Sequence, residues 1–416
     1  MSGTKPFFRK AYQDIINSIA FYPSLIGLFF FAFAIFIGAI ENASWIQGLK
    51  DYLSDFLVRD PDNARVIIGT VTAGVISLMV FSFSMVMVVL NRASATLSPR
   101  VLPGLISRKF HQIVLGYYLG TIIFSLILLI RTGNYEDKHA SLPSIGILLS
   151  MAMCVVCLSL FVYFIHSISK NIEVDHILEN IYIDTKKQLT TAKSEDSNHE
   201  KPDTAIWEIH HAPLSGYLKH LAVDALVKLC VQNQLQIAVL VPIGEFVSKD
   251  FPLFKLSKEL KGEMLDEVYS HFVFYTEERV NDHYVFGLKQ ISEIAVKALS
   301  PGINDPGTAL KGIDHLSDLF IDLAKSEKDK LIADDAGNLR LIRCEHSFEE
   351  LLFRTFMPIL HYGQHDVMVV KSLIDGVERI KSGNDRHKKS LKKLLKSIHS
   401  KSNEVSLTKW EKKYLG

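Results

Sequence analysis

The sequence predicts a membrane protein with an N-terminal four-helix transmembrane bundle followed by a mixed α/β (α+β) cytoplasmic domain. Two observations support this fold class. The long uncharged apolar stretches are concentrated in residues 19–166, whereas residues 167–416 have the mixed composition of an ordinary globular protein. Within the second part, short alternating segments indicate a small β-rich subdomain, and apolar residues at helical spacing indicate amphipathic helices.

The four transmembrane spans are predicted from length and composition. A bilayer core about 30 Å thick is crossed by roughly 20 apolar residues in a helix, because each backbone polar group has to be hydrogen-bonded within the segment. Four stretches meet this requirement and contain no Asp, Glu, Lys or Arg: about 19–40, 66–90, 113–130 and 143–165. Residues 19–166 therefore form the predicted transmembrane domain, and the lipid bilayer is its first partner.

Basic residues near the spans predict their orientation, because Lys and Arg accumulate on the cytoplasmic side of a membrane. They precede the first span and occupy the loop between the second and the third: Lys5, Arg9, Lys10, Arg92, Arg100, Arg108 and Lys109. Taken together, the other two loops contain more acidic than basic residues. We therefore expect a multi-pass protein with residues 1–18 as a cytoplasmic N-terminus and the C-terminus also in the cytoplasm.

The second span carries a narrow stripe of small and polar residues. Thr70, Ser77, Ser84 and Asn91 recur every seven residues, and Gly74 falls on the same side of a helix. One interpretation is a seam at which membrane helices pack closely, which is common for small and hydroxylated residues. The other interpretation is the lining of a water-filled path through an oligomer.

The third span contains Gly116 and Gly120 in a G-x-x-x-G spacing. Two glycines on one helix face let a neighbouring helix approach closely, so this motif predicts a helix contact and nothing about transport.

The chain lacks the residues that would indicate coupled transport or catalysis. Secondary active transporters carry ionisable side chains within the membrane, whereas here the nearest candidate is His166, at the cytoplasmic edge of the fourth span. No Walker, dinucleotide, H-E-x-x-H or G-x-S-x-G motif is present, and the net charge is only +1. We therefore expect no enzyme activity, no cofactor and no nucleic-acid partner.

Two segments resemble the signatures of a known family. Residues 94–102 read S-A-T-L-S-P-R-V-L, with Ser98, Pro99 and Arg100 near the centre, and residues 298–309 read A-L-S-P-G-I-N-D-P-G-T-A. The family consists of bacterial predicted integral membrane proteins and is known only as a domain of unknown function. The resemblance implies a protein of the bacterial cell (inner) membrane with an N-terminal helical bundle, and it implies no activity.

The cytoplasmic part divides into five predicted segments. They are a helical connector (167–190), a polar linker (191–204), a β-rich subdomain (205–276), a helical subdomain (277–380) and a basic C-terminal tail (381–416). Within the β-rich subdomain, Gln236–Val241 has the composition of a buried strand.

The second signature is explained by a corner between two helices. An apolar face from Leu288 to Leu299 predicts the first helix, and Gly302 is a natural stop. Asp305 fits the N-cap and Pro306 the first position of the next helix. The alternative is a binding site in which the N–H groups of that second helix hold a phosphate, a carboxylate or a lipid headgroup, although Asp305 opposes an anion there. The residues of interest are Ser300, Pro301, Gly302, Asn304, Asp305 and Pro306.

A further helix is predicted to start at Ser347, with Glu350 completing a capping box. His361 and His365 stand one turn apart near its end. Such a pair can bind a metal ion, but the sequence offers no evident third ligand, so no metal site is predicted.

The tail is basic and amphipathic. Between Lys381 and Lys401 there are eight Lys or Arg residues and one Asp, with leucines at helical spacing. Anionic lipid attracts such a helix by about 1 kcal/mol per basic residue near the surface. A solvated face packed on its own domain explains the pattern equally well.

These patterns lead to one functional hypothesis and one alternative. The stripe, the charge-free spans and the large cytoplasmic domain favour a homo-oligomeric, channel-like protein whose cytoplasmic domain regulates or scaffolds it. The alternative is a non-conducting envelope membrane protein whose cytoplasmic domain is a binding or scaffolding module. The stripe faces a central axis in the first case and a neighbouring helix of the same protomer in the second.

Overall fold

The structure is a computed structural model that describes residues 20–41, 44–53, 55–96, 109–133, 142–171, 174–194, 199–275, 283–325, 329–383, 386–404 and 408–415. The chain forms two compact units, which we call the membrane unit (residues 3–95 and 102–173) and the C-terminal unit (residues 96–101 and 174–416). The signature residues Ser98, Pro99 and Arg100 lie outside the described residues.

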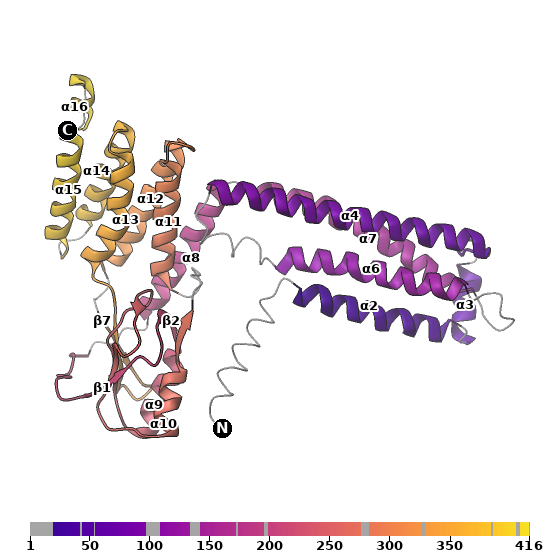
Figure 1. The fold of residues 1–416 in the computed structure, drawn as a ribbon, viewed down its shortest axis with the longest axis horizontal. Coiled ribbons are helices and arrows are strands. Elements are labelled where there is room, and N and C mark those ends of the chain that lie inside the picture. The colour runs from indigo at the N-terminus through magenta and orange to yellow at the C-terminus, as the bar shows by residue number, and fades with distance from the viewer. Residues whose placement is uncertain are drawn as a thin grey trace. The chain divides into compact units, whose positions relative to one another are not determined.

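Four long apolar helices form the membrane unit (Figure 1). They are α2 (Phe21–Ile40), α4 (Pro61–Thr96), α6 (Lys109–Gly133) and α7 (Ser144–Asn171), with the short α3 (Ser44–Tyr52) between the first two. Each contains a segment long and apolar enough to cross a bilayer: Phe21–Ile40, Pro61–Asn91, Phe110–Thr132 and Ser144–Ile168. The prediction of four apolar helices long enough to span a membrane is confirmed. The helices α4, α6 and α7 continue past the predicted ends, since polar residues can extend a helix outside hydrocarbon.

The G-x-x-x-G motif lies at the contact between α6 and α2. A Cβ atom added to Gly116 would stand 2.7 Å from Ile26 Cδ1, and one added to Gly120 would stand 2.7 Å from Phe30 Cγ. Both distances are shorter than non-bonded contacts of real Cβ atoms. The two helices can therefore approach this closely only because the two positions lack a side chain. The predicted helix contact is confirmed.

Glu41 joins three helices at one end of the bundle. Its side chain is buried, forms an ion pair with Lys50 of α3 at 2.8 Å, and accepts a hydrogen bond from the backbone N–H of Ile145 at 3.3 Å. Ile145 lies in the first turn of α7, where the helix dipole favours a negative charge. One carboxylate therefore links the end of α2 to α3 and to the start of α7.

Two sheets form the β part of the C-terminal unit. The larger has the order β1 (Glu208–His211), β5 (Pro252–Leu256), β3 (Ile237–Val239), β8 (Leu339–Cys344) and β7 (Asp329–Ala333). The smaller has the order β4 (Phe246–Val247), β2 (Gly216–Leu221) and β6 (Phe272–Tyr275). All neighbouring strands are antiparallel except β3 and β8, which run parallel with Ala238 opposite Ile342.

The strands β7 and β8 correct the predicted domain boundaries. They belong to residues 277–380, which we predicted to be helical, yet they complete the sheet begun by residues 205–276. These two strands form a hairpin. Its turn contains Gly337 with φ +80°, and the backbone N–H of Asn338 donates a hydrogen bond to the Asp334 carboxylate. The β-rich segment in turn contains two helices, α9 (Val223–Asn233) and α10 (Glu263–Ser270).

The remaining helices of the C-terminal unit pack on one another. They are α8 (Val174–Ser194), α11 (Tyr284–Ala298), α12 (Pro306–Leu323), α13 (Phe348–Gly363), α14 (Val367–Ser382), α15 (Lys388–Asn403) and α16 (Lys409–Leu415). The helix α8 covers most of the predicted connector and continues to Ser194, so the predicted linker is helical at its start.

The basic tail forms α15 and α16, and the apolar face of α15 is turned inward. Leu391, Leu394, Leu395 and Ile398 are buried, and Lys393 forms an ion pair with Glu349 of α13. This arrangement is the second of the two interpretations of the tail, a face packed on its own domain. Binding of anionic lipid by the exposed lysines stays a prediction.

We predict that Gly120→Ala destabilises the membrane unit by about 1–3 kcal/mol, because the new methyl group overpacks against the Phe30 ring. Thermal unfolding of the purified protein in detergent measures the change. Gly69→Ala is the matched control, since a Cβ there meets no atom within 4 Å. An equal melting temperature for both variants would contradict the close α2–α6 contact.

Candidate functional site

The polar stripe of α4 lies on the outer side of the membrane unit. Thr70, Gly74, Ser77, Ser84 and Asn91 are all exposed. The buried face of the same helix carries Ile68, Val75 and Ser82, each two residues before a stripe residue and therefore about 200° around the helix. The stripe thus faces away from the helices that α4 packs on.

Two of the stripe hydroxyls form hydrogen bonds within their own helix. Thr70 Oγ1 donates to the carbonyl of Val66 at 2.8 Å, and Ser77 Oγ donates to that of Ala73 at 2.9 Å. A Cβ added to Gly74 would meet no atom within 4 Å. In the part of the protomer that the structure describes, no helix covers the stripe, so its surface is available to lipid, water or a second copy of the chain.

The second signature forms the predicted corner between α11 and α12. Asp305 caps α12 by accepting the backbone N–H of Thr308 at 3.2 Å, and Pro306 is the first helical residue. The left-handed residue is Asn304 (φ +49°) rather than Gly302. Asn304 tolerates this conformation, and it directs the backbone N–H of Asp305 back to the carbonyl of Ala298 at 2.9 Å.

The other corner residues complete the turn. Ser300 Oγ donates to the carbonyl of Lys297 at 2.7 Å, and Pro301 and Gly302 are exposed. A surface pocket of about 460 Å³ adjoins the corner, and its lining includes two acidic side chains, Asp366 and Glu411. A hydrogen bond from the backbone N–H of Thr408 lowers the pKa of Glu411. Negative charge around the pocket and the Asp305 carboxylate on the N–H groups of α12 both disfavour an anion at this place.

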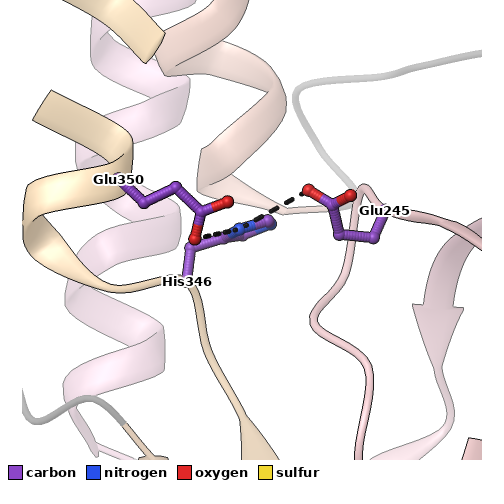
Figure 2. A group of neighbouring side chains, drawn as sticks. All are labelled: Glu245, His346 and Glu350. Carbon is purple, nitrogen blue, oxygen red and sulfur yellow. Dashed lines mark ion pairs between the residues drawn. The ribbon is translucent and has the colours of Figure 1, made fainter. Parts of the chain in front are cut away.

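A group of three side chains that the sequence analysis missed lies elsewhere in the C-terminal unit: Glu245, His346 and Glu350 (Figure 2). Glu245 follows Gly244, whose φ of +94° turns the chain between β3 and β4. His346 follows β8, and Glu350 lies in the first turn of α13. The signal within the sequence was the short spacing between His346 and Glu350, which stand on either side of the helix N-cap at Ser347.

The imidazole of His346 lies between the two carboxylates (Figure 2). Its side chain is only 1% exposed, and Nδ1 stands 3.8 Å from Glu245 Oε1 and 3.5 Å from Glu350 Oε2. On the other side of the ring, Nε2 lies 3.0 Å from the carbonyl oxygen of Ile243. A carbonyl only accepts, so Nε2 carries the proton and donates it to Ile243.

Arg354, two turns along α13, bridges the carboxylates of Glu245 and Glu350. Its Nη2 is 2.7 Å from Glu350 Oε1, and its Nη1 forms an ion pair with Glu245 Oε1. Ser347 caps α13 by accepting the N–H of Glu350 at 3.2 Å, as predicted. The Glu350 carboxylate, which a capping box would direct to the N-cap, here lies against Arg354 and His346.

A buried layer supports the group from behind. Arg343 Nε donates to Glu345 Oε1 at 2.7 Å, with both side chains at most 6% exposed, and Tyr284 donates its hydroxyl to Glu345 Oε2 at 3.0 Å. Burial raises the pKa of Tyr284 well above its usual value, and the negative charge of Glu345 adds to this, so the phenol keeps its proton. Burial, reinforced by the positive charge of Arg343, lowers the pKa of His283 well below its usual value, so that imidazole is neutral.

The histidines singled out from the sequence are not part of this layer. His361 and His365 are both exposed, and α13 ends at Gly363 between them. The described residues instead bring one histidine nitrogen and two carboxylates to within 4.8 Å of one another. Chemically, such a set can hold a divalent cation or keep an ion-pair network in place.

Comparison with known proteins extends over both units. The family described as predicted membrane protein (DUF2254) matches residues 16–379. Uncharacterized proteins of Mycobacterium bovis and Mycobacterium tuberculosis are each 26% identical over 400 residues, which cover 88% of this chain and 72% of the relative. No solved structure matches the chain. The resemblance drawn from the two signatures is therefore confirmed.

We predict that Asp305→Ala lowers the free energy of unfolding of the C-terminal unit by about 1 kcal/mol, because the N-cap of α12 loses its acceptor. Asn304→Gly serves as the control, because glycine adopts the left-handed conformation without strain. Chemical denaturation followed by circular dichroism measures both. A stable Asp305→Ala variant together with a destabilised Asn304→Gly variant would contradict this description of the corner.

Proposed function

The chain belongs to the DUF2254 family of predicted membrane proteins, and on that premise we propose that it is an oligomeric, channel-like protein of the bacterial inner membrane. Both termini lie in the cytoplasm, and the C-terminal unit regulates the assembly or acts as its scaffold. The observation that carries the proposal is the polar stripe of α4, which no described helix of the same protomer covers.

The position of the stripe supports assembly. An intramolecular packing seam would bury Gly74 and Ser77, but both are exposed on the side of α4 opposite to its buried face. Small polar residues form no favourable contact with lipid tails. A second helix can approach them closely, and water can form hydrogen bonds with their hydroxyls. Copies of the chain that meet with these faces turned toward a common axis would enclose a polar path.

The composition of the spans supports passive conduction over coupled transport. The predicted spans contain no charged residue, so a permeating solute would meet no charged side chain within them. The single acidic group described in detail at the end of the bundle, Glu41, is already paired with Lys50 and the N-terminus of α7. A relay of ionisable side chains, which proton-coupled transporters need, is therefore not suggested by these residues.

A second candidate function has its own support. The group of Glu245, His346 and Glu350 gives the C-terminal unit a candidate binding site, which suits a non-conducting envelope protein whose spans serve as an anchor. The exposed lysines of α15 would let either version of the protein bind anionic lipid at the membrane surface.

We predict that Ser77→Cys, in a chain whose four native cysteines are replaced, reacts in membranes with a charged thiol reagent that does not cross lipid. A thiolate forms only in contact with water, so a stripe that lines a path reacts and a stripe that faces lipid does not. Ile76→Cys is the matched control. It is exposed at the same depth, on another side of α4.

Conductance in planar bilayers tests the function itself. The purified parent protein should conduct, and modification of Ser77→Cys should reduce the conductance while the reagent leaves Ile76→Cys unaffected. A protein that shows no conductance and no reaction at Ser77→Cys would remove the channel proposal and favour the anchored binding module.

A further inference from the structure

We propose that Glu245, His346 and Glu350 form a binding site for a first-row divalent transition-metal ion such as Zn²⁺. The proposal concerns the C-terminal unit alone and is independent of whether the membrane unit conducts. Four observations carry it: the burial of His346 with its Nδ1 directed toward the carboxylates, the distances between the ligand atoms, the charge of the group, and the buried residues that support it.

His346 presents a free nitrogen in a buried place. Its Nε2 donates to the carbonyl of Ile243, and its other ring nitrogen, Nδ1, is directed toward the two carboxylates. Among the described residues, Nδ1 has no hydrogen-bond partner, although the side chain is only 1% exposed. A buried polar atom without a hydrogen-bond partner is destabilising, and a metal ion bound through this nitrogen would remove that cost. Metal-binding histidines show the same arrangement, with the second nitrogen fixed by a carbonyl or carboxylate.

The spacing of the ligand atoms suits a tetrahedral ion. Zinc binds nitrogen and carboxylate oxygen at about 2.0–2.2 Å, so two ligands of one ion lie roughly 3.3–3.5 Å apart. Nδ1 of His346 is 3.5 Å from Glu350 Oε2 and 3.8 Å from Glu245 Oε1. All three ligand atoms lie within 4.8 Å of one another. Small rotations of the two glutamates therefore complete three of four ligand positions, and water supplies the fourth.

The charge of the group favours a divalent cation. The two carboxylates carry two negative charges, and Arg354 neutralises one of them. A divalent ion would neutralise both. The Arg354 side chain is 50% exposed, so it can move into solvent when the ion takes its place at low desolvation cost. Arg354 therefore acts as a competitor that occupies the carboxylates while the site is empty of metal.

The nitrogen ligand selects the class of metal. Calcium and magnesium prefer sites made of oxygen ligands alone, whereas imidazole combined with carboxylates suits zinc and its first-row neighbours. The buried pair of Arg343 and Glu345 holds the backbone directly before His346, and the left-handed Gly244 fixes the turn that carries Glu245. The ligands thus stand on a rigid frame, as metal sites require.

Calorimetric titration of the purified full-length protein with Zn²⁺, after removal of bound metal with a chelator, tests the proposal. We expect one ion per chain for the parent protein. Glu350→Gln, which keeps the shape of the side chain, and His346→Gln should each weaken binding roughly 10- to 100-fold or more. His361→Ala, which removes an exposed histidine on α13, should leave the affinity unchanged.

Arg354→Gln gives a test that a purely structural network would fail. Removal of the competing cation should strengthen Zn²⁺ binding several-fold, and the visible absorption of bound Co²⁺ should report a tetrahedral site with nitrogen and oxygen ligands. Melting temperatures without metal identify any variant that has lost its fold. Absence of stoichiometric binding in both the parent and Arg354→Gln, or equal loss on His361→Ala, would overturn the proposal.

Discussion

Hydrocarbon offers no hydrogen-bond partner to a peptide group, and this constraint shapes the whole membrane unit. A segment that crosses the bilayer as a single rod therefore forms a helix, which satisfies its peptide groups internally. Polar side chains within the segment also need hydrogen-bond partners. The hydroxyls of Thr70 and Ser77 donate hydrogen bonds to carbonyls of their own helix. The hydroxyls of Ser125 in α6 and Ser150 in α7 form a hydrogen bond with each other at 2.8 Å. A helix that has satisfied its polar groups internally can then be brought close to another, as α2 and α6 are at Gly120.

The C-terminal unit meets a different constraint, because its buried charges have to be paired. Arg343 and Glu345 lie together behind the N-terminus of α13, and Tyr284 donates to the same carboxylate. Breaking such a pair leaves a buried charge without compensation, which costs several kcal/mol. The residues next to it are consequently held in place, and His346 is the residue that follows Glu345 in the chain. The rigidity of the candidate site derives from this pairing.

What the sequence made predictable was the local structure. Four apolar stretches identified α2, α4, α6 and α7, and turn chemistry identified the corner at Asp305 and Pro306. Contacts between distant segments were not predictable from one sequence. One example is the pairing of β8 with β3. Another is the hydrogen bond between His346 and the carbonyl of Ile243, which are 103 residues apart in the sequence. Even at the corner, local rules favoured Gly302 as the stop of the first helix, whereas α11 ends at Ala298 and the left-handed residue is Asn304.

At the start of α13, a side chain that local sequence predicts to cap the helix interacts instead with residues brought near by the tertiary fold. The spacing of Ser347 and Glu350 predicts a reciprocal capping box, and half of it forms, because Ser347 accepts the N–H of Glu350. The Glu350 carboxylate instead turns toward His346 and Arg354. Sequences usually agree with their local structure, and they depart from it where function imposes another geometry. The departure of Glu350 from its predicted partner therefore supports the binding site that we propose at Glu245, His346 and Glu350.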